Sequence, residues 1–154
     1  MNKKTIEQIR RIVNSDNWPL DFNEWPEELN KFTNCLSFAL GIPIPDKDYK
    51  LFDGPKLQIR KDILKFLKIM NLEWREIANI QEAKEDEIII QGYEFWVPVS
   101  GEDFHVIRRN LNGMWVHKQG WHRAPKIIKN PNNLHCHMHP DGITCIFAVK
   151  KRTS

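Results

Sequence analysis

Apolar residues recur at helical spacing in two long stretches of the chain. Residues 3 to 14 place isoleucine and valine three and four positions apart, which is the pattern of an amphipathic helix. Residues 57 to 70 repeat this spacing, and Asn71 is expected to end that helix. Between them, a shorter apolar run over residues 35 to 40 predicts a short helix. The first half of the chain therefore predicts helices.

The second half of the chain has the residue types of β-strands. Residues 88 to 99 are rich in isoleucine, valine and aromatic residues, but Pro98 cannot donate to a ladder, so this strand lies at an edge or is interrupted there. Residues 101 to 120 predict a β-hairpin, and residues 143 to 149 predict a last strand. Helices followed by antiparallel strands favour an α+β fold, with the N-terminal helices packed on a small antiparallel sheet.

The predicted hairpin carries one histidine on each arm, and its turn decides whether they share a face. A two-residue turn places His105 and His117 on opposite faces, because side chains alternate along a strand. A three-residue loop with Gly113 in the left-handed conformation instead pairs Asn110 with Met114. Both histidines then lie diagonally on one face, roughly 7–8 Å apart. Both turns suit Asn-Gly, and we favour the three-residue loop.

Cys35 is the candidate nucleophile. Thr33 and Asn34 are good N-cap residues, and Gly41 follows the apolar run, so Cys35 falls in the first turn of the short helix. Backbone N–H groups there lack intrahelical partners and the helix dipole favours an anion. Both effects lower the pKa of a thiol, so we expect a reactive thiolate. A thiolate that faces a histidine on a strand is a working pair of nucleophile and base.

This arrangement resembles the papain-like cysteine hydrolases of the NlpC/P60 superfamily, in which a cysteine opens a helix and a later strand pair carries a histidine and a polar residue. The segment from Asp103 to Trp121 is also similar to small bacterial and phage proteins with Asn-Cys helices. The likeness covers about residues 30 to 120 and implies a single papain-like domain over residues 1–154. It implies that Cys35 is the nucleophile, His105 the general base and His117 the orienting group.

The resemblance also implies a reaction. A peptidase-like or amidase-like hydrolase would act on a peptide, amide or acyl substrate through a thioester, without a cofactor. Relatives implied by the resemblance cleave peptidoglycan peptides, deamidate glutamine or process acyl esters. A catalytically silent papain-like binding module and a deamidase-type effector remain alternatives. Substituting Cys35→Ala separates them, because a binding module keeps its partner without the thiol.

Four further residues are candidates for contacts with substrate. Trp18 and Trp25 precede the short helix and are expected to wall a groove, and Trp121 lies in a loop that borders the site. The side chain of Asn34 is a candidate oxyanion donor beside the backbone N–H of Cys35. The plainer interpretations are that the first two tryptophans cover the core and that Asn34 caps the helix.

A histidine cluster offers a different chemistry. His135, His137 and His139 alternate, and on a strand their imidazoles would share one face and suit Zn²⁺ or Cu²⁺. The turn signal over residues 139 to 142 interrupts such a strand, so we favour an exposed turn, and a metalloprotein that uses these three histidines is the less favoured alternative. The other two cysteines lie among these histidines and inside the last predicted strand, and neither is a candidate nucleophile.

Composition limits the function further. The 154 residues suit one domain, and 41% hydrophobic residues suffice for a core. A net charge of +3 with a pI near 8.8 is mild, and the basic residues are spread along the chain, so we expect no specific nucleic-acid partner. Arg108 and Arg109 flank the turn and are interpreted as surface charge, with the steering of a carboxylate or phosphate by one of them as the alternative. Lys118, which points away from the His117 face, receives no role.

Cysteine usage and hydropathy indicate the compartment. Three cysteines with no pairing pattern favour reducing conditions. The first residues lack the apolar stretch of a signal peptide, and no transmembrane stretch is present in the sequence. We expect synthesis in the cytoplasm, with delivery as an effector or release as a phage product as alternatives.

Overall fold

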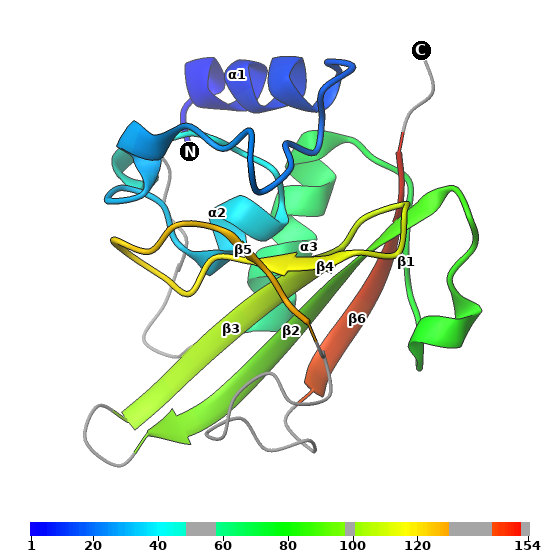
Figure 1. The fold of residues 1–154 in the computed structure, drawn as a ribbon. Coiled ribbons are helices and arrows are strands. Elements are labelled where there is room, and N and C mark those ends of the chain that lie inside the picture. The colour runs from blue at the N-terminus through cyan, green and yellow to red at the C-terminus, as the bar shows by residue number, and fades with distance from the viewer. Residues whose placement is uncertain (49–57, 98–100, 130–142, 152–154) are drawn as a thin grey trace.

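The computed structural model describes residues 1–48, 58–97, 101–129 and 143–151. Within these ranges, helices cover one face of an open antiparallel sheet (Figure 1). The α+β class expected from the sequence is therefore confirmed. Each helix in the described ranges is too short or too polar to cross a membrane.

Along the chain, the α-helices come first and the strands follow them. In chain order, with 3-10 helices labelled η, they are α1 Lys3–Val13, η1 Glu27–Leu29, α2 Cys35–Ala39, η2 Asp46–Asp48, α3 Ile59–Met70, β1 Trp74–Glu76, η3 Ile80–Glu82, β2 Glu87–Val97, β3 Gly101–Arg109, β4 Trp115–His117, β5 Lys126–Ile127 and β6 Ile143–Lys150. The strand order is β1-β6-β2-β3-β4-β5, and every neighbouring pair is antiparallel. The last strand in sequence therefore lies inside the sheet.

The predicted helices form for identifiable local reasons. Asn2 caps α1, because its Oδ1 accepts a hydrogen bond of 2.8 Å from the backbone N–H of Thr5. Glu94 on β2 accepts a 2.8 Å bond from the N–H of Ile59 and so ties the start of α3 to the sheet. Asn71 ends α3 with φ of 57°, the left-handed conformation that asparagine tolerates. The predictions of these helices and of the stop at Asn71 are confirmed.

The two faces of the sheet carry separate apolar clusters. Helix α3 packs on β2 and β6, α2 packs on β3 and β4, and α1 packs on α3. On β3, Val106 belongs to the cluster beneath the helices, whereas Ile107 belongs to the cluster on the opposite face. This alternation decides on which side of the sheet each residue of the candidate site lies.

The hairpin between β3 and β4 has the three-residue loop that the sequence favours. The N–H of Asn110 donates to the carbonyl of Met114 over 2.9 Å, and Gly113 has φ of 87°. That prediction is confirmed. Strand β2 lies between β6 and β3, so the alternative that places it at an edge is wrong. It ends at Val97, and Pro98 lies outside the described residues.

Candidate active site

The two histidines of the hairpin form a hydrogen-bonded pair. His105 Nε2 lies 2.8 Å from His117 Nδ1, and the two rings meet edge to face with an interplanar angle of 77°. Both side chains are buried. One of the two nitrogens donates and the other accepts, which fixes the tautomers relative to each other. In the tautomer in which His105 Nε2 carries the proton and donates to His117, Nδ1 is the nitrogen of His105 that can accept a proton.

Cys35 is the first residue of α2, as predicted. Asn34 is the N-cap, and its Oδ1 accepts hydrogen bonds from the N–H groups of Leu36 and Ser37 over 3.0 and 3.1 Å. The amide oxygen of Asn34 therefore serves the helix. Any contact from this side chain to an oxyanion would come from Nδ2, the other end of the amide.

The thiol of Cys35 is shielded from water. Only 4% of the residue is exposed. Burial raises the pKa of the thiol to about 12, and the carboxylate of Asp103 adds to the rise. Backbone N–H groups, of which that of Val106 contributes most, lower the pKa, but they do not compensate for lost hydration. The N–H groups at the helix start thus act in the expected direction, but burial outweighs them, so the expectation of a lowered pKa and a resting thiolate is wrong.

The thiol meets β3 at the residue next to His105. The residues of β3 that pair with β4 are Arg108 and Arg109. The backbone N–H of Val106, which bonds to the thiol of Cys35, therefore lies outside the paired part of the strand. Cys35 and Val106 belong to the cluster under the helices. His105 pairs with Tyr93, which lies in the cluster on the opposite face.

The three predicted catalytic residues thus lie on opposite faces of the same piece of β3. The thiol approaches from the helix side, and the imidazoles of His105 and His117 lie on the other side. In the described register, β4 does not cover the edge of β3 at Val106. The sulfur of Cys35 and the ring of His105 could therefore meet only at this uncovered edge of β3.

The tryptophans differ in their settings. Trp18 is fully buried and donates from Nε1 to the carbonyl of Leu40 over 2.9 Å. Trp25 packs edge to face on Phe38 with ring centroids 5.2 Å apart. Both cover the core, so the predicted groove walls at Trp18 and Trp25 are not formed, because apolar burial holds these rings inside. Trp121 is half exposed and stays a candidate for contact with substrate.

Two buried cations were missed by the sequence reasoning. Arg108, interpreted as surface charge, is fully buried and donates to the carbonyls of Phe38 and Leu20 over 2.8 and 2.6 Å. Burial lowers its pKa to about 10. Lys118, which received no role, is also fully buried. The signal was strand alternation, because both residues share the parity of the buried valines Val106 and Val116.

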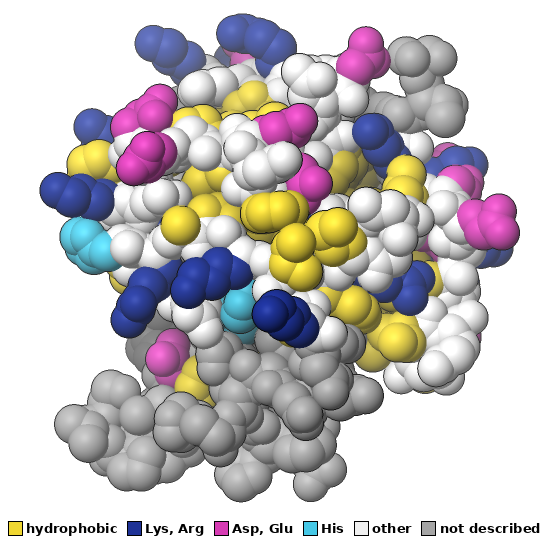
Figure 2. Space-filling model, viewed as in Figure 1, with side chains coloured by type: hydrophobic (Ala, Val, Ile, Leu, Met, Phe, Trp, Pro, Cys, Tyr) yellow, Lys and Arg dark blue, Asp and Glu magenta, His cyan; other side chains and the backbone are white. Residues whose placement is uncertain are grey.

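Other candidate chemistry is limited. The histidine cluster at residues 135 to 139 lies outside the described residues, and so does Cys136. In the part of the chain that the structure describes, no three histidine, cysteine, aspartate or glutamate side chains lie close enough together to hold a metal ion. Acidic and basic side chains intermingle on the face shown in Figure 2, as expected for solvated charges.

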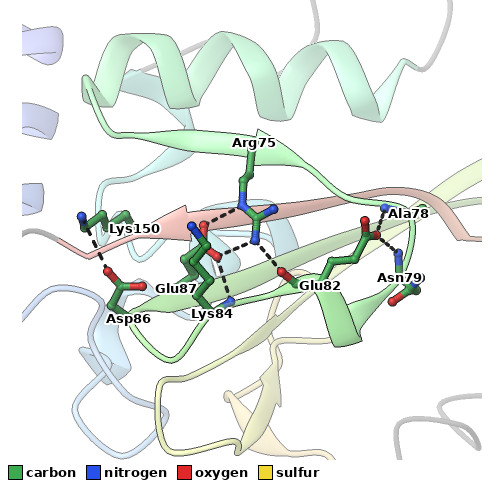
Figure 3. A network of polar contacts seen from close by, with 8 residues as sticks. All are labelled: Arg75, Ala78, Asn79, Glu82, Lys84, Asp86, Glu87 and Lys150. Atoms are coloured by element: carbon green, nitrogen blue, oxygen red, sulfur yellow. Dashed lines mark hydrogen bonds and ion pairs between the residues drawn. The ribbon is translucent and has the colours of Figure 1, made fainter.

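A charged hollow of about 190 Å³ lies at the opposite edge of the sheet. It is lined by Glu73, Trp74, Arg75, Lys84, Asp86, Glu87 and Lys150. Figure 3 shows that Arg75 makes two hydrogen bonds to the carboxylate of Glu87, of 3.0 and 2.8 Å, and a third to the carbonyl of Glu82. These groups satisfy one another, so the network holds the edge strand β1 and is not a candidate site.

Comparison of the chain with protein-family models, with curated proteins and with solved structures finds no match. The function proposed below therefore rests on the residues and their geometry.

Proposed function

We propose that the protein is a cysteine hydrolase of the peptidase or amidase type, with Cys35 as nucleophile, His105 as general base and His117 as the group that orients His105. The observation that carries this proposal is the 2.8 Å contact between His105 Nε2 and His117 Nδ1, next to the strand residue whose N–H meets the thiol. A cysteine at a helix start, an imidazole on a strand and a polar partner behind it are the parts that thiol-based acyl transfer requires.

On the basis of the same cysteine and histidines, we propose that the chain is a papain-like domain that resembles the NlpC/P60 superfamily. A short helix that begins at Cys35 packs on β3 and β4, the two strands that carry the histidines. Substrates of this class are peptides, amides or acyl compounds, and the reaction needs no cofactor. Because unpaired cysteines favour a reducing compartment, we propose cytoplasmic synthesis, with effector delivery or phage release as alternatives.

The proposed reaction begins from a neutral pair. Since burial raises the pKa of Cys35 to about 12, the resting thiol holds its proton. The sulfur attacks the carbonyl carbon of the substrate while the thiol proton passes to Nδ1 of His105. The resulting oxyanion accepts hydrogen bonds from the N–H of Cys35 and from Nδ2 of Asn34.

The second half of the reaction regenerates the enzyme. The protonated His105 gives its proton to the leaving amine or alcohol, and the carbon–leaving-group bond breaks to leave a thioester on Cys35. His105 then takes a proton from water, which attacks the thioester; the carbon–sulfur bond breaks, and the sulfur takes that proton back from His105. His117 keeps the same tautomer and orientation of His105 through both halves.

Cys145 provides a matched control for a test of this proposal. It too is buried, its thiol pKa is also raised to about 12 by burial, and it lies on β6. We would measure iodoacetamide labelling of each cysteine in the folded protein by peptide mapping. Cys35 is expected to react about 100-fold faster than Cys145, since a positioned base contributes this much or more. The excess should disappear in His105→Ala.

Equal and slow labelling of both thiols, or a Cys35 rate that His105→Ala leaves unchanged, would contradict the proposal. The burial of Cys35 favours a second candidate, a catalytically silent papain-like binding module, because only 4% of the residue is exposed. Equal labelling is the result expected for that module. Retention of its partner by Cys35→Ala would then support it.

A further inference from the structure

Lys118 follows directly after β4, and it places an ammonium group inside the molecule. Its side chain is fully buried. Nζ donates to the backbone carbonyls of Asn30 and Thr33 over 2.8 and 2.7 Å, and to that of Gly120. Three carbonyls match the three N–H groups of an ammonium. The charge is thus held by backbone oxygens at defined positions.

Two of these carbonyls belong to the segment that leads into the nucleophile helix. Thr33 immediately precedes Asn34, the N-cap of α2, and Cys35 follows. The carbonyl of Asn30 also accepts a 2.9 Å bond from the N–H of His122. Lys118 and the chain that follows it are therefore fastened to the segment before Cys35.

His117 and Lys118 are adjacent, and their side chains act on opposite sides of the strand. His117 contacts the ring of His105 at 2.8 Å. Lys118 contacts the carbonyl of Thr33, two residues before the thiol. One dipeptide therefore connects the base and the nucleophile through short, directional hydrogen bonds.

We propose that Lys118 is a positioning residue, which sets the start of α2, and with it the thiol of Cys35, relative to the His105–His117 pair. This inference rests on the proposed function. Stability of the fold alone does not explain a buried lysine here. Burying a charge is costly, and an apolar side chain of similar volume often gives a fold equal stability. Hydrogen bonds from a charged donor, in contrast, define position.

Arg108 offers a matched control at the other end of the same helix. It is equally buried, and Nη1 donates to the carbonyls of Phe38 and Ala39 over 2.8 and 3.4 Å. It therefore holds the C-terminal end of α2, away from Cys35. Loss of either cation should destabilise the fold, but only loss of Lys118 should release the end that carries the thiol.

The test compares Lys118→Met with Arg108→Met in the full chain. The measured quantity is the iodoacetamide labelling rate of Cys35 divided by that of Cys145 in the same sample. Transient unfolding exposes both thiols together, so a loss of stability adds the same labelling rate to Cys35 and to Cys145. Urea unfolding curves give the size of this shared rate, which is subtracted before the ratio is taken. Misplacement by about 1 Å costs up to about 100-fold in positioned reactions. We expect the ratio to fall at least about tenfold in Lys118→Met and to stay near the wild-type value in Arg108→Met, after this correction.

Equal ratios in the two variants would overturn the inference about Lys118. A wild-type ratio near one would instead overturn the proposed function, so the two failures are distinguishable. Lys118→Gln replaces Lys118→Met where the latter does not fold, because its amide still donates to two carbonyls. It is expected to give an intermediate ratio, and a wild-type ratio in Lys118→Gln would also count against the inference.

Discussion

Gly92 on β2 lies so close to Cys145 on β6 that a Cβ atom at Gly92 would stand 2.9 Å from Cys145 Sγ. The same atom would lie 3.1 Å from the Cδ1 of Ile63 on α3. The register between β2 and β6 also shifts directly after Gly92. The missing side chain is what lets α3 and the thiol of Cys145 pack on the sheet at this point.

Gly92→Ala should therefore destabilise the protein by overpacking. Extra methyl groups in a well-packed core cost about 1–3 kcal/mol, and urea unfolding of wild type and variant measures the difference. The double variant Gly92→Ala with Cys145→Ala tests the cause. Because it removes the sulfur that the new methyl group would meet, it should lose less stability than the sum of the single variants. Additive losses would show that the contact with Cys145 is not responsible.

The buried thiols should make the protein less stable in alkali. The pKa of Cys35 is raised from its ordinary value of 9.0 to about 12, so between these values the unfolded chain releases a proton that the folded chain keeps. The stabilising effect is complete below pH 9 and is lost as the pH rises towards 12. The slope is about 1.4 kcal/mol per pH unit for one thiol.

Unfolding free energies measured from pH 8 to pH 11 test this slope. Cys35→Ala should lose stability less steeply with rising pH than wild type does, whatever its stability at pH 8. Cys145→Ala is the matched control and should flatten the curve to a similar extent, because burial raises the pKa of that thiol to about 12 as well. Parallel curves for wild type and Cys35→Ala would contradict the raised pKa.

Local sequence signals predicted the parts of the site, and tertiary packing decided their environment. Asn34 and Gly113 carry cap and turn chemistry that acts over a few residues, so the start of α2 and the three-residue hairpin loop were predictable. The pKa of Cys35 was not, because it depends on how completely the sheet and helices exclude water from the thiol. A helix start favours a thiolate only where water or a cation remains nearby.

The buried cations and the shortest strands escaped prediction for a related reason. Lys118 is satisfied by carbonyls from residues 30 and 33, more than 80 positions earlier in the chain, and no local pattern reports such partners. Strands β1 and β5 span three and two residues, too few to show a period of two. They form because neighbouring strands supply hydrogen-bonding partners.

Replacing His117 should test its orienting role separately from folding. His117→Leu removes the partner of His105 Nε2 and leaves that nitrogen facing an apolar group, so the labelling ratio of Cys35 to Cys145 should fall about tenfold or more. His117→Asn keeps a polar amide in the same place and should retain more of the ratio. A wild-type ratio in His117→Leu would mean that His105 is oriented by other contacts.

The Arg75–Glu87 pair in Figure 3 can be compared with a second pair, Arg60–Glu76, which has similar geometry and different burial. Glu87 is 8% exposed and accepts two bonds from Arg75, whereas Glu76 is 36% exposed and binds Arg60 in the same two-pronged way. Glu87→Gln should cost about 1–3 kcal/mol, because a shielded charge-assisted bond is lost. Glu76→Gln should cost less than about 1 kcal/mol, because water screens an exposed pair.

The pH dependence of Glu87→Gln provides the sharper check. The hydrogen bonds from Arg75 hold the pKa of Glu87 below its ordinary value of 4.5. Its contribution to stability is therefore present above pH 4.5 and is lost as the pH falls through the lower folded value. The stability difference between wild type and Glu87→Gln should shrink when urea unfolding is repeated at decreasing pH below 4.5. A difference that stays constant down to pH 2 would show that Glu87 acts through packing and not through its charge.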